Sequence, residues 1–323
     1  MVDFTKGLIS AIELTEILDV TIQGVYKLIS TNNIETISVN ARKKVCSPSG
    51  VRKLLESRGY KYPDQNISIQ IVKGGVGKTG LSFCLGVRAS HYGAKVLLVD
   101  LDQQGNLTSS FSIDSRDKPV WLNLIRKEVT VEEAVIKLSD NLSIIPSSLN
   151  NSRLDTELTQ SLSNLKDLIK DILEPIRDQF DLVIFDCPPA INKIVAAATC
   201  ASDRVIIPIN PDPYALDGLE FTLAELKSIK SNFKIDFDHQ IIWNNYDARQ
   251  RLGSFYMHEL TKDEDRINHI FPVVIRTDTN LKNSVFAAKS IFEETRKTAI
   301  KEDIDQFTRE VLGINAWSEA NRA

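Results

Sequence analysis

Short apolar runs follow one another along most of the chain, and stretches of helical period separate them. From residue 67 onward this pattern is typical of a parallel sheet with helices on both faces. The runs are rich in Val, Ile and Leu, as expected of strands that are buried on both sides. We therefore predict an α/β fold with a doubly wound, mostly parallel sheet. The candidate strands are Ile67–Val72, Val96–Leu101, Leu142–Pro146, Leu182–Asp186, Arg204–Ile209, Gln240–Asn244 and Phe271–Val274.

The first sixty residues have a different pattern, which predicts two short helices joined by a tight turn. Ser10 and Glu13 have the spacing of a capping box at the start of the first helix. Thr21 is placed to cap the second helix, so that the pair forms a helix-turn-helix. The outward residues of the second helix that suit contacts with base edges and phosphates are Gln23, Tyr26 and Lys27.

A β-hairpin is predicted over Ile34–Val45, and a third helix over Ser47–Arg58. The order of helix-turn-helix, hairpin and helix resembles the MerR-like winged DNA-binding domains; a helical module for protein contacts is the alternative. The predicted division is residues 1–60 for the winged helix-turn-helix domain, 61–66 for a linker and 67–323 for the second domain. The hairpin tip carries three basic residues suited to a phosphate backbone, Arg42, Lys43 and Lys44.

At 323 residues the chain is long enough for about two domains. No apolar run approaches the ~18 residues of a membrane span, and the start of the chain lacks a leader pattern, so we expect a cytoplasmic protein. The four cysteines form no C-x-x-C pair and the four histidines are scattered, so we expect reduced thiols and no histidine metal site. The net charge is −4, although residues 1–66 hold nine Lys or Arg against seven Asp or Glu. DNA binding must therefore depend on local basic patches.

The segment Ile71–Thr79, which reads Ile-Val-Lys-Gly-Gly-Val-Gly-Lys-Thr, lies between a predicted strand and a predicted helix. This is the context of a phosphate-binding loop, whose glycines let backbone N–H groups turn toward phosphates at a helix N-terminus. Lys78 is expected to reach the β- and γ-phosphates, and the Thr79 hydroxyl to hold Mg²⁺. The residues expected to contact the nucleotide are Gly74, Gly75, Val76, Gly77, Lys78, Thr79 and Gly80.

A second lysine, Lys73, stands directly before the loop glycines. It is badly placed to reach the nucleotide of its own subunit, but within reach of the phosphates of a facing subunit. This feature resembles the deviant Walker A motif of the ParA/MinD-like ATPases. The resemblance implies a P-loop NTPase fold, hydrolysis of ATP with Mg²⁺, and a homodimer that closes on ATP as a sandwich. Lys73, acting across that dimer, and Lys78 are the catalytic lysines it implies.

Acidic residues at two strand ends are placed to complete such a site, because groups at the carboxyl ends of parallel strands meet at one edge of the sheet. Asp186 ends one strand and is expected to hold Mg²⁺. Asp100 and Asp102 follow another strand and point to the same side. We assign Asp100 to supporting Mg²⁺ and Thr79, and Asp102 to orienting the attacking water.

The motifs KGGVGKT, VLLVDLDQQGN, FDCPP and VIIPINPDPYALDGL occur in the order and spacing of the ParA partition ATPases, and the resemblance extends from about Ile67 to Leu312. It implies that Asn244 or Asn245 helps to select the base. The family usually has a second hydroxyl residue where this chain has Gly80, so we expect weaker nucleotide binding. The loop that the resemblance places beside the adenine contains Pro211, Asp212 and Pro213.

Three functions fit these observations. The first is a plasmid or chromosome partition ATPase on the nucleoid, which binds DNA non-specifically as an ATP dimer, is released by a ParB-like partner, and represses its own operon through the N-terminal domain. The second is a nucleotide-responsive repressor. The third is a MinD-like membrane switch, which the apolar stripe Ile304, Phe307 and Val311 argues against, because it is expected to face the core. The resemblance to the ParA family implies that the ATPase domain contacts non-specific DNA through segments that here contain Arg249, Arg251, Arg276 and Lys282.

Overall fold

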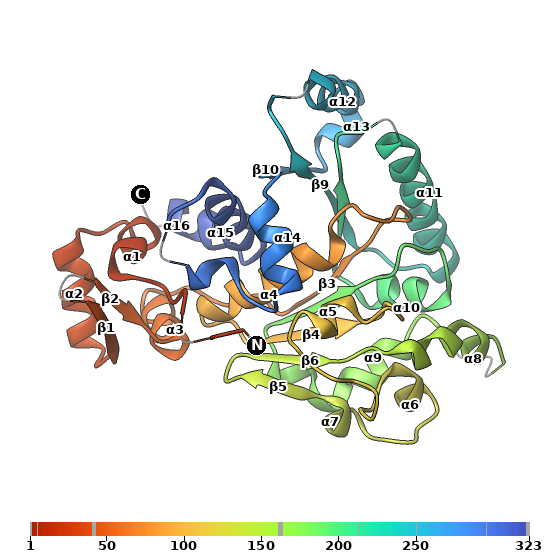
Figure 1. Cartoon of the computed structure of the whole chain (residues 1–323), viewed down its shortest axis with the longest axis horizontal. Helices are drawn as coiled ribbons and strands as arrows, with labels where there is room; N and C mark the ends of the chain where they lie inside the picture. The colour runs from red at the N-terminus through yellow and green to blue at the C-terminus, as the bar shows by residue number, and fades with distance from the viewer. Residues whose placement is uncertain are drawn as a thin grey trace.

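An eight-stranded sheet forms the centre of the molecule (Figure 1). All neighbouring strands are parallel except β5 and β6, which are antiparallel at one edge. The computed structural model describes residues 2–4, 6–40, 43–160, 164–212, 214–249, 251–294 and 296–320. In sheet order the strands are β10 (Ile270–Arg276), β9 (Asp238–Tyr246), β8 (Arg204–Ile209), β3 (Gln65–Ile69), β7 (Leu182–Asp186), β4 (Val96–Asp100), β6 (Leu142–Ile145) and β5 (Ile136–Ser139).

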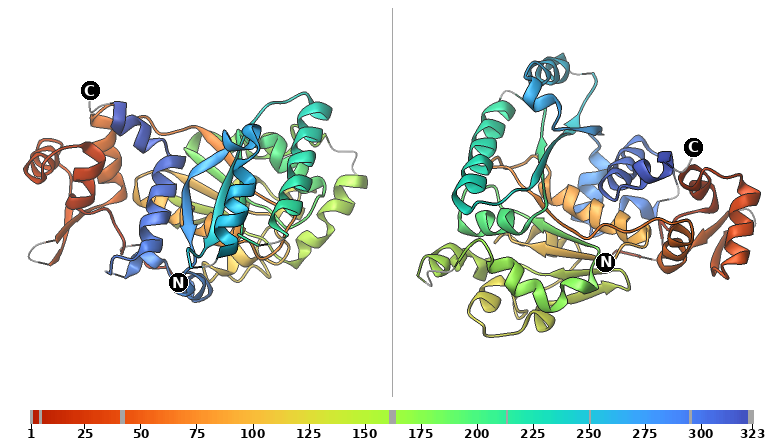
Figure 2. Two further views of the ribbon diagram at one scale, coloured as in Figure 1. Left: turned by 90° about the horizontal axis from the view of Figure 1, so that it is seen from above. Right: turned by 180° about the vertical axis from the view of Figure 1, so that it is seen from behind.

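Helices cover both faces of this sheet (Figures 1 and 2). Successive strand residues point to opposite faces, so Leu98 packs in the core on one side and Leu97 in the core on the other. The first side holds α4 (Lys78–His91), α14 (Thr279–Phe286), α15 (Ala299–Val311) and α16 (Ile314–Ala320). The second holds α8 (Leu154–Gln160), α9 (Leu168–Leu173), α10 (Lys193–Ala201), α11 (Ala215–Phe233) and α12 (Arg251–Thr261). Short helices complete the connections: α5 (Asn106–Ser109), α6 (Trp121–Ile125), α7 (Val131–Ala134), α13 (Glu264–Ile267), η1 (Leu149–Arg153), η2 (Glu174–Gln179) and η3 (Ile291–Glu293).

The predicted α/β fold with a mostly parallel sheet is confirmed, although several strand bounds differ and one strand was missed. β3 begins at Gln65, inside the predicted linker, and ends at Ile69, because the chain leaves the sheet there to form the phosphate-binding loop. β9 is longer than the predicted Gln240–Asn244. The antiparallel edge strand β5 was not predicted, since four residues at a sheet edge carry little periodic signal.

The N-terminal segment contains the predicted elements. Ser10 and Glu13 form the capping box: the backbone N–H of Ser10 donates to Oε2 of Glu13 (2.8 Å), and that of Glu13 to Oγ of Ser10 (3.3 Å). Oγ1 of Thr21 accepts from the N–H of Gly24 (3.2 Å) and caps the second helix. The elements are α1 (Ala11–Leu18), α2 (Ile22–Thr31), β1 (Thr36–Asn40), β2 (Lys43–Cys46) and α3 (Pro48–Ser57).

This segment packs closely against α4, α15 and α16, as all three views in Figures 1 and 2 show. Arg88 of α4 is 2% exposed and donates to Oε1 of Glu13 (2.7 Å) and Oδ1 of Asp305 (2.5 Å). The Tyr60 hydroxyl donates to the carbonyl of Leu312 (2.6 Å). The helix that begins at the phosphate-binding loop thus shares a buried ionic cluster with the N-terminal segment.

In α15 the predicted apolar stripe is buried, with Ile304 and Phe307 fully inaccessible. Two acids of the same helix are engaged in ion pairs within the chain. Asp303 pairs with Arg276, and Asp305 with Arg88. No helix in the described part of the chain is long and apolar enough to cross a membrane.

Candidate functional site

The loop between β3 and α4 needs glycine at two positions. Gly75 and Gly77 have φ values of 75° and 89°, in the left-handed region where side chains are strained. A Cβ at Gly77 would also lie 2.3 Å from Nδ2 of Asn244, at the end of β9. That amide donates to the carbonyl of Val76 (2.7 Å). The end of β9 therefore holds the loop in a shape that turns N–H groups toward an anion.

Lys78 begins α4, and its side chain folds back into the loop, where it is 7% exposed. Its Nζ donates to the carbonyl oxygens of Lys73 (3.0 Å) and Ile71 (3.4 Å). Burial lowers the pKa of this ammonium, and the nearby carboxylate of Asp186 opposes the shift. An ammonium held at a helix N-terminus among such N–H groups suits a polyphosphate.

Two carboxylates lie side by side next to the loop, at the carboxyl ends of adjacent strands. Asp100 of β4 and Asp186 of β7 are register partners, and both are fully buried. Asp186 accepts hydrogen bonds from Oγ1 of Thr79 (2.8 Å) and Oγ of Ser82 (2.9 Å). Burial raises the pKa of Asp186 to about 6; burial and the charge of Asp186 together raise that of Asp100 to about 8. Clustered oxygens of this kind suit a hard divalent cation, which would offset the cost of burying two acids.

Asp100, which we expected to support Thr79, instead holds the connection that follows β4. Its Oδ2 accepts from the backbone N (2.9 Å) and Oγ1 (2.7 Å) of Thr108, and its Oδ1 accepts from the N–H of Asp102 (3.2 Å). Both oxygens are thereby engaged, and the hydroxyl of Thr79 pairs with Asp186 alone. Of the three acids, only Asp102 is partly exposed, as a residue that positions a water must be.

Lys73 forms an ion pair with Asp212 of the same chain. Its ammonium lies 5.7 Å from the centre of the Tyr214 ring, which is 70% exposed. We expected Asp212 beside the adenine, but its carboxylate serves Lys73 and accepts from the N–H of Tyr214 (3.0 Å). Pro211 is half-buried in the same loop, and Pro213 lies outside the described residues.

A cavity of about 460 Å³ opens beside the loop. Asn245, expected to help select the base, lines it, whereas Pro211 and Asp212 do not. Gly80 also lines it, and a Cβ there would meet nothing within 4 Å, so the missing hydroxyl residue leaves open space. The apolar wall comes from residues that the sequence did not indicate, because they carry no motif and only the fold brings them here: Leu281, Val285 and Phe286 of α14.

Four of the candidate DNA-binding residues of the N-terminal segment have described side chains, and all four are exposed: Gln23, Tyr26, Lys27 and Lys44. Gln23, Tyr26 and Lys27 are exposed on α2, as predicted. Nζ of Lys44, on β2, lies 6.0 Å from the centre of the Tyr26 ring, so the hairpin and the helix adjoin. Arg42 and the side chain of Lys43 lie outside the described residues.

Two of the basic residues that we assigned to non-specific DNA, Arg249 and Arg276, are engaged within the chain. Arg249 pairs with Asp247 (2.8 Å). Arg276 of β10 forms a two-point salt bridge with Asp303 of α15: Nε donates to Oδ2 (2.9 Å) and Nη2 donates to Oδ1. To contact a phosphate, Arg276 would have to leave an acid that is only 8% exposed, so this arrangement does not support its assignment. The side chains of Arg251 and Lys282 lie outside the described residues.

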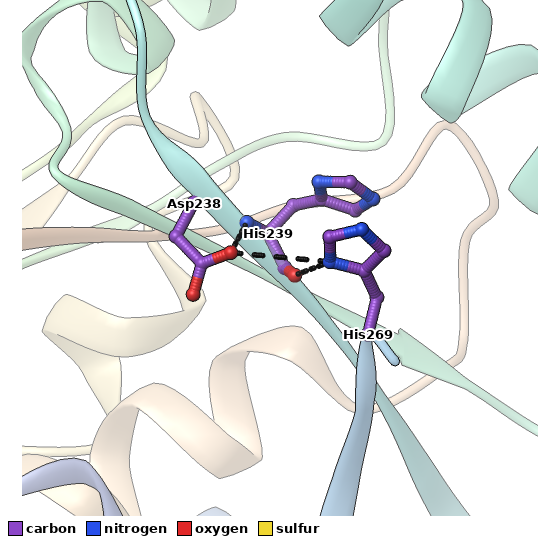
Figure 3. Close-up of side chains that lie close together, drawn as sticks. All are labelled: Asp238, His239 and His269. Carbon is purple, nitrogen blue, oxygen red and sulfur yellow. Dashed lines mark hydrogen bonds and ion pairs between the residues drawn. The ribbon is translucent and has the colours of Figure 1, made fainter. Parts of the chain in front are cut away.

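The fold also brings together two histidines that looked scattered in the sequence, His239 and His269 (Figure 3). With Asp238 they form a cluster at the amino ends of β9 and β10, at the opposite edge of the sheet from the phosphate-binding loop. The rings stack 3.9 Å apart with an angle of 20° between their planes, and Nδ1 of His269 lies 3.0 Å from the carbonyl of His239. In-plane lone pairs of parallel rings do not converge on one ion, so this geometry is not that of a formed metal site.

Comparison with known proteins identifies the family. A family model described as an AAA domain matches residues 64–239. The sporulation initiation inhibitor protein Soj of Bacillus subtilis is 33% identical, over 61% of this chain and 78% of its own length. The chromosome partitioning protein ParA of Caulobacter vibrioides is 30% identical, over 81% of this chain and 98% of its own length. The solved structure of apo McdA from Cyanothece superposes with a TM-score of 0.69 at 25% identity, covering 77% of this chain and 99% of that one. The chain therefore belongs to the ParA family of AAA-domain proteins.

Proposed function

We propose that this chain is a partition ATPase, which hydrolyses ATP with Mg²⁺, closes with a second copy on ATP, and binds DNA in that state. A ParB-like partner then stimulates hydrolysis and releases it from the nucleoid. The observation that carries the proposal is the phosphate-binding loop with an additional lysine, Lys73, beside two buried acids in a member of the family of Soj and ParA.

The residues of the site have distinct roles in this reaction. Lys78 and the N–H groups of the loop bind the β- and γ-phosphates. Thr79 and Asp186 would hold Mg²⁺, which offsets phosphate charge during phosphoryl transfer. Asp102 orients the attacking water, and Asp100 keeps Asp102 in place through the hydrogen bond to its backbone.

The position of Lys73 supports the proposal of a sandwich dimer. In the single chain its charge is neutralised by Asp212, at the exposed edge of the site. The phosphates of a facing subunit carry more negative charge and would take this ammonium from Asp212. Gly74 has no atom within 4 Å of an added Cβ, so Gly74→Val should spare monomer binding of ATP and obstruct closure of the dimer. A normal ATP-dependent dimer of this variant in sedimentation equilibrium would refute the closure.

The N-terminal segment, residues 1–60, supports operator binding as a second activity. Its α2 presents polar and basic residues beside the hairpin, in the arrangement that a winged helix-turn-helix domain uses on DNA. A repressor tuned by nucleotide is the alternative main function, and the ion pairs of Arg88 favour it, because they connect α4 of the ATP site to this segment. A MinD-like membrane switch has no such support, since the apolar stripe of α15 is buried.

Binding to a long non-specific DNA fragment, measured with ATP, ADP or no nucleotide across a salt series, tests the proposal. We expect binding only with ATP, falling steeply as salt rises. Binding that ignores nucleotide, or that prefers ADP and one sequence, would favour the repressor. Lys282→Ala and Arg276→Ala test whether these two residues contact DNA. If both variants bound the non-specific fragment as tightly as wild type, the assignment of these residues to DNA would be wrong.

A further inference from the structure

Two asparagine side chains form a directed chain of hydrogen bonds from the phosphate-binding loop to the cavity beside it. Nδ2 of Asn210 donates to the carbonyl of Gly75 (3.4 Å), and Oδ1 of Asn210 accepts from Nδ2 of Asn245 (2.9 Å). A backbone carbonyl can only accept, so it must face the NH₂ group of Asn210. Oδ1 of Asn210 can likewise only accept, so the NH₂ group of Asn245 must face Asn210. The direction of both amides is thereby set by the loop.

This direction leaves one group of Asn245 free. Its Oδ1 has no hydrogen-bond donor in the described part of the chain, and the residue lines the cavity of about 460 Å³. Neighbouring residues of an extended strand point to opposite sides, yet Asn244 and Asn245 line the same cavity. Asn245 achieves this with a left-handed backbone, φ 52°, which asparagine tolerates better than most residues.

The cavity also has room and an apolar wall for a base. Gly77, Thr79 and Gly80 all line this cavity, and a Cβ at Gly80 would meet nothing within 4 Å, so phosphates bound at the loop would have free space beside them for a nucleoside. Leu281 and Val285 of α14 then form the wall against which a flat ring can lie. Asn245 lines this cavity, and its Oδ1 is an acceptor. A polar group in a mostly apolar pocket can distinguish bases of similar shape.

We propose that Asn210 is a positioning residue for base selection: by holding the Asn245 amide with its oxygen toward the cavity, it makes the site prefer a purine with an amino group at position 6. Adenine presents an N–H donor there, whereas hypoxanthine and guanine present a carbonyl oxygen, which Oδ1 of Asn245 repels. This inference rests on the proposed ATPase function and adds the means by which the site distinguishes ATP from ITP and GTP.

Titration calorimetry of the full chain with Mg²⁺ and ATP, ITP or inorganic tripolyphosphate tests this inference. Wild type should bind ATP about tenfold more tightly than ITP, the effect of one hydrogen bond in a partly buried site. Asn210→Ala removes the acceptor that turns Asn245, and should bring the ratio of ITP to ATP dissociation constants to within about twofold. Asn210→Asp keeps an acceptor for Nδ2 of Asn245, so its ratio should remain near that of wild type even if repulsion by the Gly75 carbonyl weakens both nucleotides. Asn283→Ala, an exposed asparagine of α14, is the matched control and should change nothing.

The outcomes separate this inference from the function on which it rests. Equal binding of ATP and ITP by wild type, or an unchanged ratio in Asn210→Ala, overturns the positioning role while leaving the ATPase in place. If wild type bound neither ATP nor tripolyphosphate, the proposed function itself would be overturned. Loss of the ratio in Asn210→Asp as well as in Asn210→Ala would also overturn the role, because it would show that an acceptor at this position does not set the preference.

Discussion

If ATP closes two copies of the chain as proposed, the ion pair between Lys73 and Asp212 predicts that a single charge change tightens that dimer. Asp212→Asn removes the negative charge but keeps an oxygen that can accept from the N–H of Tyr214, so the turn is preserved. The side chains of Lys73 and Asp212 are 24% and 31% exposed, so the pair is worth about 1 kcal/mol. A sandwich dimer breaks two such pairs. The variant should therefore dimerise more tightly by about 2 kcal/mol, or about thirtyfold in Kd.

Sedimentation equilibrium with Mg²⁺ and a non-hydrolysable ATP analogue measures this change. Asp217→Asn is the matched control, because it removes the same charge from an exposed position near the start of α11. An unchanged or weaker dimer in Asp212→Asn would refute the reasoning. If the variant instead lost affinity for ATP as a monomer, Asp212 would belong beside the adenine, as the sequence first suggested.

Three further predictions follow from the geometry. Gly77→Ala should abolish ATP binding in calorimetry, because the left-handed backbone costs an alanine about 1–2 kcal/mol and its Cβ would lie 2.3 Å from Nδ2 of Asn244. Gly74→Ala is the control, because a Cβ at Gly74 would meet nothing within 4 Å. Equal affinities of the two variants for ATP would contradict this prediction. Arg88→Leu should lower the free energy of unfolding by about 3–5 kcal/mol in urea, since it removes the buried guanidinium that Glu13 and Asp305 share and leaves Asp305 with Arg309 alone as a cationic partner. Arg116→Leu, at an 83% exposed ion pair, should change it by less than about 0.5 kcal/mol, and similar losses in the two variants would be inconsistent with the cluster. His91 is fully buried and burial lowers its pKa to about 3; the unfolded chain therefore binds the extra proton, and stability is lost as pH falls below about 6.5. His91→Leu should remove about 2 kcal/mol of the loss between pH 7.5 and pH 5, and identical pH slopes for the two proteins would count against it.

The sequence predicted what depends on local spacing. The capping box of Ser10 and Glu13 and the cap at Thr21 depend on residues three positions apart, and the structure contains both. The strand, glycine-rich loop and helix around Gly77 form another such pattern. Buried strands of the parallel sheet were found because their hydrophobic runs are continuous.

Contacts between distant parts of the chain could not be predicted in this way. Asp100 was assigned to Thr79, but the chain after β4 curls back and Thr108 donates to its carboxylate. Asp212 was assigned to a position beside the base, and the sequence did not show that in the single chain it pairs with Lys73, 139 positions away. The wall formed by Leu281 and Val285 is visible only in the fold, because no periodicity tells which helix will lie beside a loop. Arg88 carries no motif either, and only the fold shows that it connects α4 to α1 and α15.

We propose that ATP closes two copies of this chain face to face, with Lys73 crossing to the phosphates of the other copy. The most direct test compares wild type with Lys73→Ala by sedimentation, with Mg²⁺ and a non-hydrolysable ATP analogue, after calorimetry has established that both monomers bind it. We predict a dimer for wild type and a monomer for Lys73→Ala. A wild type that stays monomeric when saturated, or a Lys73→Ala protein that dimerises as tightly as wild type, would contradict the account.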